Sequence, residues 1–246
     1  LHAAGMLLLV DEAHGAHLQF SDQLPISAMD AGADLAAQST HKLLGSMTQT
    51  SMLMVRGEAA KVRRAASLLQ STSPNYLLLA SLDIARLQMA QSGAEKLSAA
   101  IELSKVLRAE ISFGGLSTFD TVKNFRLDLT KVTVNVEELG LTGIEAEKIL
   151  RHELKIQCEL SDAANLLFLI SHADPCERIS KLIGALKKLP THKKKKAMTK
   201  IFDLPAEINS AIMTPRETFF AISEPASLDK CAGRICAEEV TFYPPG

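Results

Sequence analysis

Two short polar stretches hold the side chains of this sequence that are best suited to chemistry. VDEAHGAH at 10–17 contains two acids and two histidines, and QSTHK at 38–42 contains two hydroxyls, a histidine and a lysine. A lysine amine can form a Schiff base with a carbonyl carbon, and an acid beside an aromatic nitrogen can keep that nitrogen protonated. Hydroxyl and backbone N–H groups are common phosphate donors.

Together these groups match the needs of pyridoxal 5'-phosphate (PLP), which requires a lysine, an acid at its ring nitrogen and donors for its phosphate. Lys42 would supply the amine and Asp11 the acid. Ser39, Thr40 and His41 precede that lysine and offer the donors. Ala13 is small enough to let a flat ring approach closely.

The spacing leaves two other sites open. His14 and His17 form an H-x-x-H pair that, with His41, could bind a metal ion. Asp11, His14 and Ser39 could form a nucleophilic triad, although the G-x-S-x-G elbow of such enzymes is missing from the sequence. A strand-end acid and a single lysine can also be ordinary solvated residues.

Short strands must position both stretches. The apolar run MLLLV at 6–10 predicts a strand buried on both faces, as in a parallel sheet under helices. Further strands are predicted at 34–38 and 51–55. Ligands of open α/β sheets bind beyond the carboxyl ends of the strands, where both polar stretches would lie.

The remainder of the sequence predicts more α/β structure. A helix is expected at 58–71, and a long one at about 75–108 with Gly93 as a weak point. The alternation that follows predicts a small α/β domain. Its predicted strands are 131–136, 155–160 and 166–171, and its predicted helices are 143–154 and 175–189; the basic run at 190–196 would be a solvated linker and 205–246 a partly irregular segment.

The composition of the sequence bears on which partners and which compartment are expected. The 27 basic and 28 acidic residues nearly cancel, which gives no electrostatic reason to expect a nucleic-acid or membrane partner. Neither an apolar stretch of about 20 residues nor a signal peptide is visible. The cysteines form no CxxC pair, so free thiols in a reducing cytoplasm are expected. These cysteines are Cys158, Cys176, Cys231 and Cys236.

Four longer stretches resemble one family. LLVDEAHGAH (8–17), GADLAAQSTHKLLGSMTQTSML (32–53), STSPNYLLLASLDIAR (71–86) and YPPG (243–246) are similar, in order, to the Orn/Lys/Arg decarboxylases. That family belongs to the fold type I, aspartate-aminotransferase-like PLP enzymes. The AHGAH variant resembles its short bacterial and cyanobacterial branch, which is arginine decarboxylase-like.

The resemblance implies a role for each matching residue. Lys42 would be the catalytic residue that binds PLP as a Schiff base, and Asp11 would pair with the pyridine nitrogen. Ser39 and His41 would bind the phosphate. Ala13 and His14 would lie near the ring, and residues 71–76 would border the site near a dimer interface.

The implied activity is PLP-dependent decarboxylation of a basic amino acid. Arginine, giving agmatine, is the first candidate substrate, with lysine or ornithine as alternatives. Another fold type I activity, such as an aminotransferase, and a truncated non-catalytic paralogue stay open. A homodimer or higher homo-oligomer in the cytoplasm is expected, with the active site at its interface.

The resemblance also divides the chain. Residues 1–110 would be the second half of the PLP-binding large domain, and 111–246 a small α/β C-terminal domain with a linker near 190–197. The sequence starts at Leu1 and stops at Gly246, and the family's upstream phosphate loop and ring-stacking histidine are not in it. We therefore expect a C-terminal fragment that holds part of the site.

Overall fold

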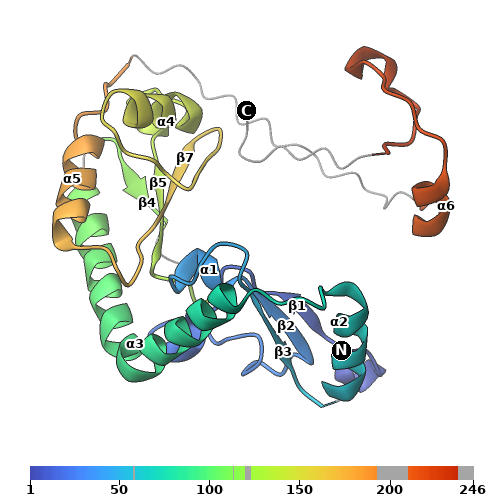
Figure 1. Ribbon diagram of the computed structural model, residues 1–246. Helices are drawn as coiled ribbons and strands as arrows, with labels where there is room; N and C mark the ends of the chain where they lie inside the picture. The colour runs from blue at the N-terminus through green and yellow to red at the C-terminus, as the bar shows by residue number, and fades with distance from the viewer. Residues whose placement is uncertain (58, 113, 120–122, 193–209, 238–246) are drawn as a thin grey trace. The chain divides into compact units, whose positions relative to one another are not determined.

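The computed structural model describes residues 1–57, 59–112, 114–119, 123–192 and 210–237. It contains two compact units, Leu1–Ala197 and Met198–Gly246. Both of its sheets lie in the first unit (Figure 1). The predicted division near residue 110 lies inside this unit and stays a prediction.

The first sheet has the strand order β1-β2-β3. β1 (Leu9–Asp11) runs parallel to β2 (Leu35–Gln38), and β3 (Met52–Val55) pairs with β2 in the antiparallel direction. The strands predicted at 34–38 and 51–55 are therefore confirmed. The strand predicted at 6–10 begins later, and its expected burial on both faces is wrong, because Leu9 is 66% exposed. No described element covers that face of the sheet, whereas Ala36 on the opposite face is fully buried.

One helix lies between β2 and β3 in the chain, and two more follow β3. α1 (Thr40–Leu43) is a single turn after β2, and α2 (Ala59–Leu69) confirms the helix predicted at 58–71. α3 (Tyr76–Ile111) is rich in good helix formers and extends about 54 Å. The side chain of Asn75 caps its first turn by accepting hydrogen bonds from the N–H groups of residues 77 and 78.

The long helix predicted at about 75–108 is confirmed, and it runs through Gly93 without interruption. Gly93 is buried inside the helix, and a Cβ at this position would lie 3.4 Å from both Met89 Sδ and Phe20 Cβ. The absent side chain lets the segment that follows β1 pack closely on the helix.

The second sheet is antiparallel, with the order β4-β5-β7-β6. α4 (Gly143–His152) and α5 (Cys176–Leu186) lie beside it and confirm the two predicted helices (Figure 1). The strand predicted at 155–160 is largely wrong, because Lys155 has φ 57° and the backbone there closes the end of α4. The strands are β4 (Ser117–Thr118), β5 (Lys131–Asn135), β6 (Leu160–Ser161) and β7 (Asn165–Leu169).

α3 packs into three apolar clusters in succession. Its Ala85 and Met89 contact Ala16 and Leu44, close to the two polar stretches. Farther along, Leu97 and Ile101 pack around Leu24. The last turns join the core of the second sheet, whose strands contribute Val132, Val134, Leu166 and Phe168. One helix thus carries packing from the first sheet to the second.

The second unit contains little regular structure among its described residues, as predicted for 205–246. α6 (Pro215–Phe220) begins with a capping box between Thr214 and Glu217. Residues 193–197 of the predicted linker and the YPPG stretch lie outside the described residues. Short 3-10 helices complete the fold: η1 (His2–Ala4), η2 (Leu18–Phe20), η3 (Glu137–Leu139) and η4 (Leu228–Lys230).

Candidate functional site

A concave pocket of about 580 Å³ opens on the uncovered face of the first sheet. The strand register brings Asp11, Ala37 and Leu53 side by side, so these side chains share that face. Four predicted site residues line the pocket together, namely Asp11, Ala13, Ser39 and Lys42. His14 and His41 are not among its lining residues.

Asp11 ends β1 with one carboxylate oxygen engaged and one available. Its Oδ1 accepts a hydrogen bond of 3.0 Å from the N–H of Ala13, which turns the chain away from the strand. Its Oδ2 makes no hydrogen bond with the described residues. A carboxylate held in this way can accept a hydrogen bond from a protonated ring nitrogen in the pocket.

Glu12 points to the other side of the sheet and was not singled out from the sequence. Its Oε1 accepts from Ala28 N at 2.7 Å, and its Oε2 accepts from the buried amide of Gln38 at 2.6 Å. Gly15 lies against it, and a Cβ there would be 2.1 Å from Glu12 Cγ. Successive side chains along a strand point to opposite faces of the sheet, and this alternation is the sequence signal that places Glu12 and Asp11 on different faces.

Ser39 and Lys42 are brought together by one helical turn. Ser39 precedes α1, and its carbonyl accepts a 3.1 Å hydrogen bond from the N–H of Lys42. Thr40 lies between them and is 2% exposed, so this turn is anchored in the core. The Lys42 side chain is exposed, and within the described ranges its ammonium has no hydrogen-bond partner. An amine in this position is available for a carbonyl compound in the pocket.

His41 does not line the pocket. Its Nδ1–H donates a 2.7 Å hydrogen bond to the backbone oxygen of Thr50, which leaves Nε2 as the nitrogen available to a ligand. A carbonyl oxygen can only accept, so this contact fixes the tautomer of the neutral ring. The phosphate role expected for His41 stays a prediction.

His14 is half-buried near two lysines. Burial first, and then the positive charges of Lys42 and Lys131, hold the pKa of His14 below its ordinary value, while Glu159 opposes them. The His14 imidazole is therefore neutral at neutral pH. A neutral ring can lie against an aromatic ligand without adding charge to the site.

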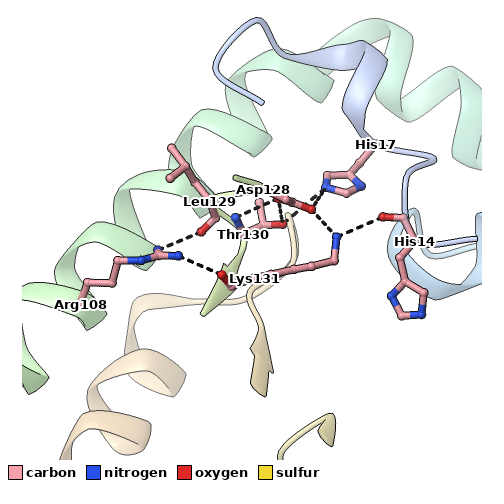
Figure 2. Close-up of polar contacts among 7 residues, drawn as sticks. All are labelled: His14, His17, Arg108, Asp128, Leu129, Thr130 and Lys131. Atoms are coloured by element: carbon pink, nitrogen blue, oxygen red, sulfur yellow. Dashed lines mark hydrogen bonds and ion pairs between the residues drawn. The ribbon is translucent and has the colours of Figure 1, made fainter. Parts of the chain in front are cut away.

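The two alternative sites gain no support from the geometry. His17 Nε2 is engaged with Asp128 at 3.0 Å (Figure 2), and His17 does not line the pocket. Within the described part of the chain, no group of three or more histidine, cysteine or acidic side chains could hold a metal ion. Among the same residues, no hydrogen bond links Asp11, His14 and Ser39 as a nucleophilic triad requires.

The donor set of the pocket fits PLP. The amine of Lys42, the available oxygen of Asp11 and the hydroxyl of Ser39 line one cavity with the small side chain of Ala13. The apolar side chains of the same sheet face, Leu9, Leu35 and Leu53, give a flat aromatic ring a surface to lie on. No described helix has the length and apolar character needed to cross a bilayer.

Comparison with known proteins identifies the family of the chain. The family described as "Orn/Lys/Arg decarboxylase, major domain" matches residues 1–133. The chain is 40% identical over 257 residues to the arginine decarboxylase of Bacillus anthracis and 40% identical over 256 residues to that of Bacillus subtilis. Each match covers all of this chain and 52% of the relative, so the chain spans about half the length of these curated relatives.

Solved structures share the fold. The lysine decarboxylase of Francisella novicida has a TM-score of 0.62 and 23% identity, and the match covers 74% of this chain and 32% of that one. The alanine–glyoxylate aminotransferase of Nostoc sp. has a TM-score of 0.58 and 22% identity, covering 76% of this chain and 54% of that one. The fold is therefore that of the fold type I PLP enzymes.

Proposed function

Because this chain belongs to the Orn/Lys/Arg decarboxylase family, we propose that it takes part in the PLP-dependent decarboxylation of a basic amino acid. Arginine is the first candidate substrate, since the curated relatives at 40% identity are arginine decarboxylases. The observation that carries the proposal is the convergence of Asp11, Ala13, Ser39 and Lys42 on one pocket.

Each predicted site residue has a definite task in this proposal. Lys42 would hold PLP covalently through its Nζ, and Asp11 would bind the ring nitrogen. Ala13 and His14 would flank the ring, while Ser39 and His41 would bind the phosphate. When bound, PLP supplies the electron sink that makes cleavage of a bond to the substrate α-carbon feasible.

The protein's own contribution is orientation and proton placement. Asp11 Oδ2 would accept the hydrogen bond of the ring N–H, so that the proton stays on that nitrogen. The Lys42 amine would leave and return to the same position because Ser39 and Thr40 fix the turn that carries it. The neutral His14 would add no competing charge, and the apolar strip of the sheet would exclude water from the ring.

A homo-oligomer in the cytoplasm is part of the proposal, with residues 71–76 near its interface. The end of α2 and the start of α3 expose four large apolar side chains, a pattern typical of protein–protein contacts. Their exposed fractions are 80% for Leu68, 89% for Leu69, 79% for Tyr76 and 70% for Leu77. The partner molecules would thus be a small amino acid and further copies of the chain.

The test starts from the complete encoded polypeptide that carries these residues, incubated with PLP and then reduced with borohydride. We expect a pyridoxyl adduct on Lys42 in a peptide map, its loss in Lys42→Ala, and its retention in the exposed control Lys105→Ala. An adduct elsewhere, or an unchanged adduct in Lys42→Ala, would contradict the proposal.

Product analysis separates the competing activities. The structural similarity to an aminotransferase makes transamination the second candidate, and Asp11 and Lys42 serve both reactions. Release of CO₂ from arginine, lysine or ornithine supports decarboxylation and ranks the substrates. Formation of a keto acid without CO₂ would favour transamination, and attachment of PLP with neither product would favour a non-catalytic paralogue.

A further inference from the structure

The segment of residues 126–131, which follows β4 and leads into β5, lies against the loop that follows β1 (Figure 2). Its contacts join parts of the chain that are distant in sequence. Arg126 donates to the backbone oxygen of Asp22 at 2.7 Å, and Lys131 donates to the backbone oxygen of His14 at 3.2 Å. The loop after β1 contains His14, an expected neighbour of the cofactor. The segment that leads into the second sheet therefore contacts this loop directly.

Asp128 is the centre of these contacts. Its Oδ2 accepts from His17 Nε2 at 3.0 Å and from the Lys131 ammonium. Its Oδ1 accepts from the N–H and the hydroxyl of Thr130, at 3.0 and 2.6 Å. Both carboxylate oxygens are thus satisfied, as a largely buried charge requires.

The protonation states follow from the surroundings. Burial opposes the charge on Asp128, but the hydrogen bond and charge of His17, together with Lys131, hold the pKa of this carboxyl well below its usual range. Asp128 is therefore an anion that can only accept, and His17 must donate through Nε2. The Asp128–Lys131 contact is an ion pair between a carboxylate and an ammonium.

Lys131 is itself held at its backbone. It is the first residue of β5 and pairs with Leu169 of β7. Arg108 of α3 donates to the backbone oxygens of Leu129 and Lys131 at 3.0 and 2.9 Å (Figure 2). The ammonium that contacts His14 therefore extends from a rigid base in the second sheet.

We propose that Asp128 and Lys131 are positioning residues that fix the backbone of His14 and thereby the placement of its imidazole at the proposed site. The inference rests on the proposed function, because it gives His14 and Lys42 their roles at the cofactor. Asp128 orients the Lys131 ammonium, and Lys131 holds the His14 carbonyl. Neither side chain lines the pocket or touches the reacting atoms.

The two parts of the loop after β1 are held by different contacts. Leu18, Phe20 and Leu24 pack into the apolar cluster around Leu97 and Ile101 of α3. In the part nearer the pocket, Ala16 packs in another apolar cluster, and His14 and His17 make polar contacts. Removal of the Lys131 ammonium should therefore loosen residues 12–17 while the apolar part and the second sheet stay folded.

The experiment measures backbone amide exchange in the complete polypeptide without PLP. Lys131→Met keeps the length of the side chain and removes the charge and the donor. We expect about tenfold faster exchange at residues 12–17, with unchanged exchange in β5 and β7. Lys131→Arg restores a cation and should restore slow exchange, whereas the matched control Lys105→Met, which removes an exposed partner of Glu102, should match the wild type.

Asp128→Asn provides a second variant and should speed the same amides, because the ammonium loses its anionic partner. If this variant does not fold, the result with Lys131→Met decides. Unchanged exchange at 12–17 in Lys131→Met, or an equal increase in β5 and β7, would overturn the positioning role. Absence of PLP attachment to Lys42 in the wild type would instead overturn the proposed function, and it is read in a separate measurement.

Discussion

Gly15 lies so close to Glu12 that a Cβ on the glycine would be 2.1 Å from Cγ of the acid. Glu12 cannot easily withdraw, because its two oxygens bind Ala28 N and the Gln38 side chain. We expect Gly15→Ala to lower the free energy of unfolding by about 1–3 kcal/mol through overpacking.

Gly184 provides the matched control for this change. It lies within α5, and a Cβ there would meet no atom within 4 Å. Gly184→Ala should therefore raise the free energy of unfolding by about 0.4–1 kcal/mol. Urea unfolding of both variants checks the pair, and equal effects would contradict the close contact at Gly15.

The four cysteines should differ sharply in reactivity. Burial raises the pKa of the Cys158 thiol to about 11, with Glu147 adding to the effect. Cys176, Cys231 and Cys236 are exposed. Iodoacetamide at pH 8 should modify these three in the folded protein and reach Cys158 only after unfolding, because the thiolate is the reacting form.

Mass spectrometry of the modified peptides, with and without denaturant, shows which cysteines have reacted. Cys176→Ser should remove one modification from the folded protein, while a serine at 158 should leave the folded pattern unchanged. Rapid modification of Cys158 under native conditions would mean that its surroundings are open.

The predicted strand ends were sufficient to bring four of the candidate site residues together. Asp11, Ala13, Ser39 and Lys42 each follow or end a short strand, and the parallel pairing of β1 and β2 brings them to one pocket. His14 and His41 were also singled out, but their rings lie off the pocket lining. Lys131 donates to the backbone oxygen of His14, and the His41 ring donates to the backbone oxygen of Thr50; spacing along the chain encodes neither contact.

Contacts between residues far apart in the sequence could not be predicted from local sequence patterns. Asp128 has no neighbour in sequence that marks it as a partner of His17, and β5 begins at Lys131 with an ordinary alternating pattern. The error at 155–160 has a local cause, since the left-handed backbone of Lys155 ends α4 where a strand was expected. The exposure of Leu9 depends on which elements cover the sheet, and no residue of the strand itself determines that.

Asp11→Asn isolates the charge of the acid at the proposed cofactor site. The asparagine oxygen can still accept from Ala13 N, so the loop and the free energy of unfolding should be nearly unchanged. Loss of the carboxylate at a ring nitrogen should lower kcat by roughly 10²–10³. Asp22→Asn, at an exposed position, is the control and should keep full activity; equal activity in both variants would contradict the role of Asp11.

His14 gives the protein a pH dependence whose sign follows from its surroundings. Burial and the charges of Lys42 and Lys131 hold its pKa below the ordinary 6.5, with Glu159 opposing and His17 adding slightly to the decrease. The unfolded chain therefore binds a proton at His14 at a higher pH than the folded protein does. In the window just below pH 6.5 the unfolded state holds more protons, so the free energy of unfolding should fall as pH falls.

The measurement is urea unfolding at pH 7.5 and 5.5, combined with NMR titration of the His14 ring. His14→Gln should reduce the loss of stability between these two pH values. The remaining loss is assigned in part to His172, whose pKa is also lowered, first by burial. Lys131→Met removes one of the cations and should raise the pKa of His14, while Lys105→Met should leave it unchanged. A His14 pKa at or above 6.5 in the wild type would contradict both the electrostatic argument and the proximity of the ring to Lys42.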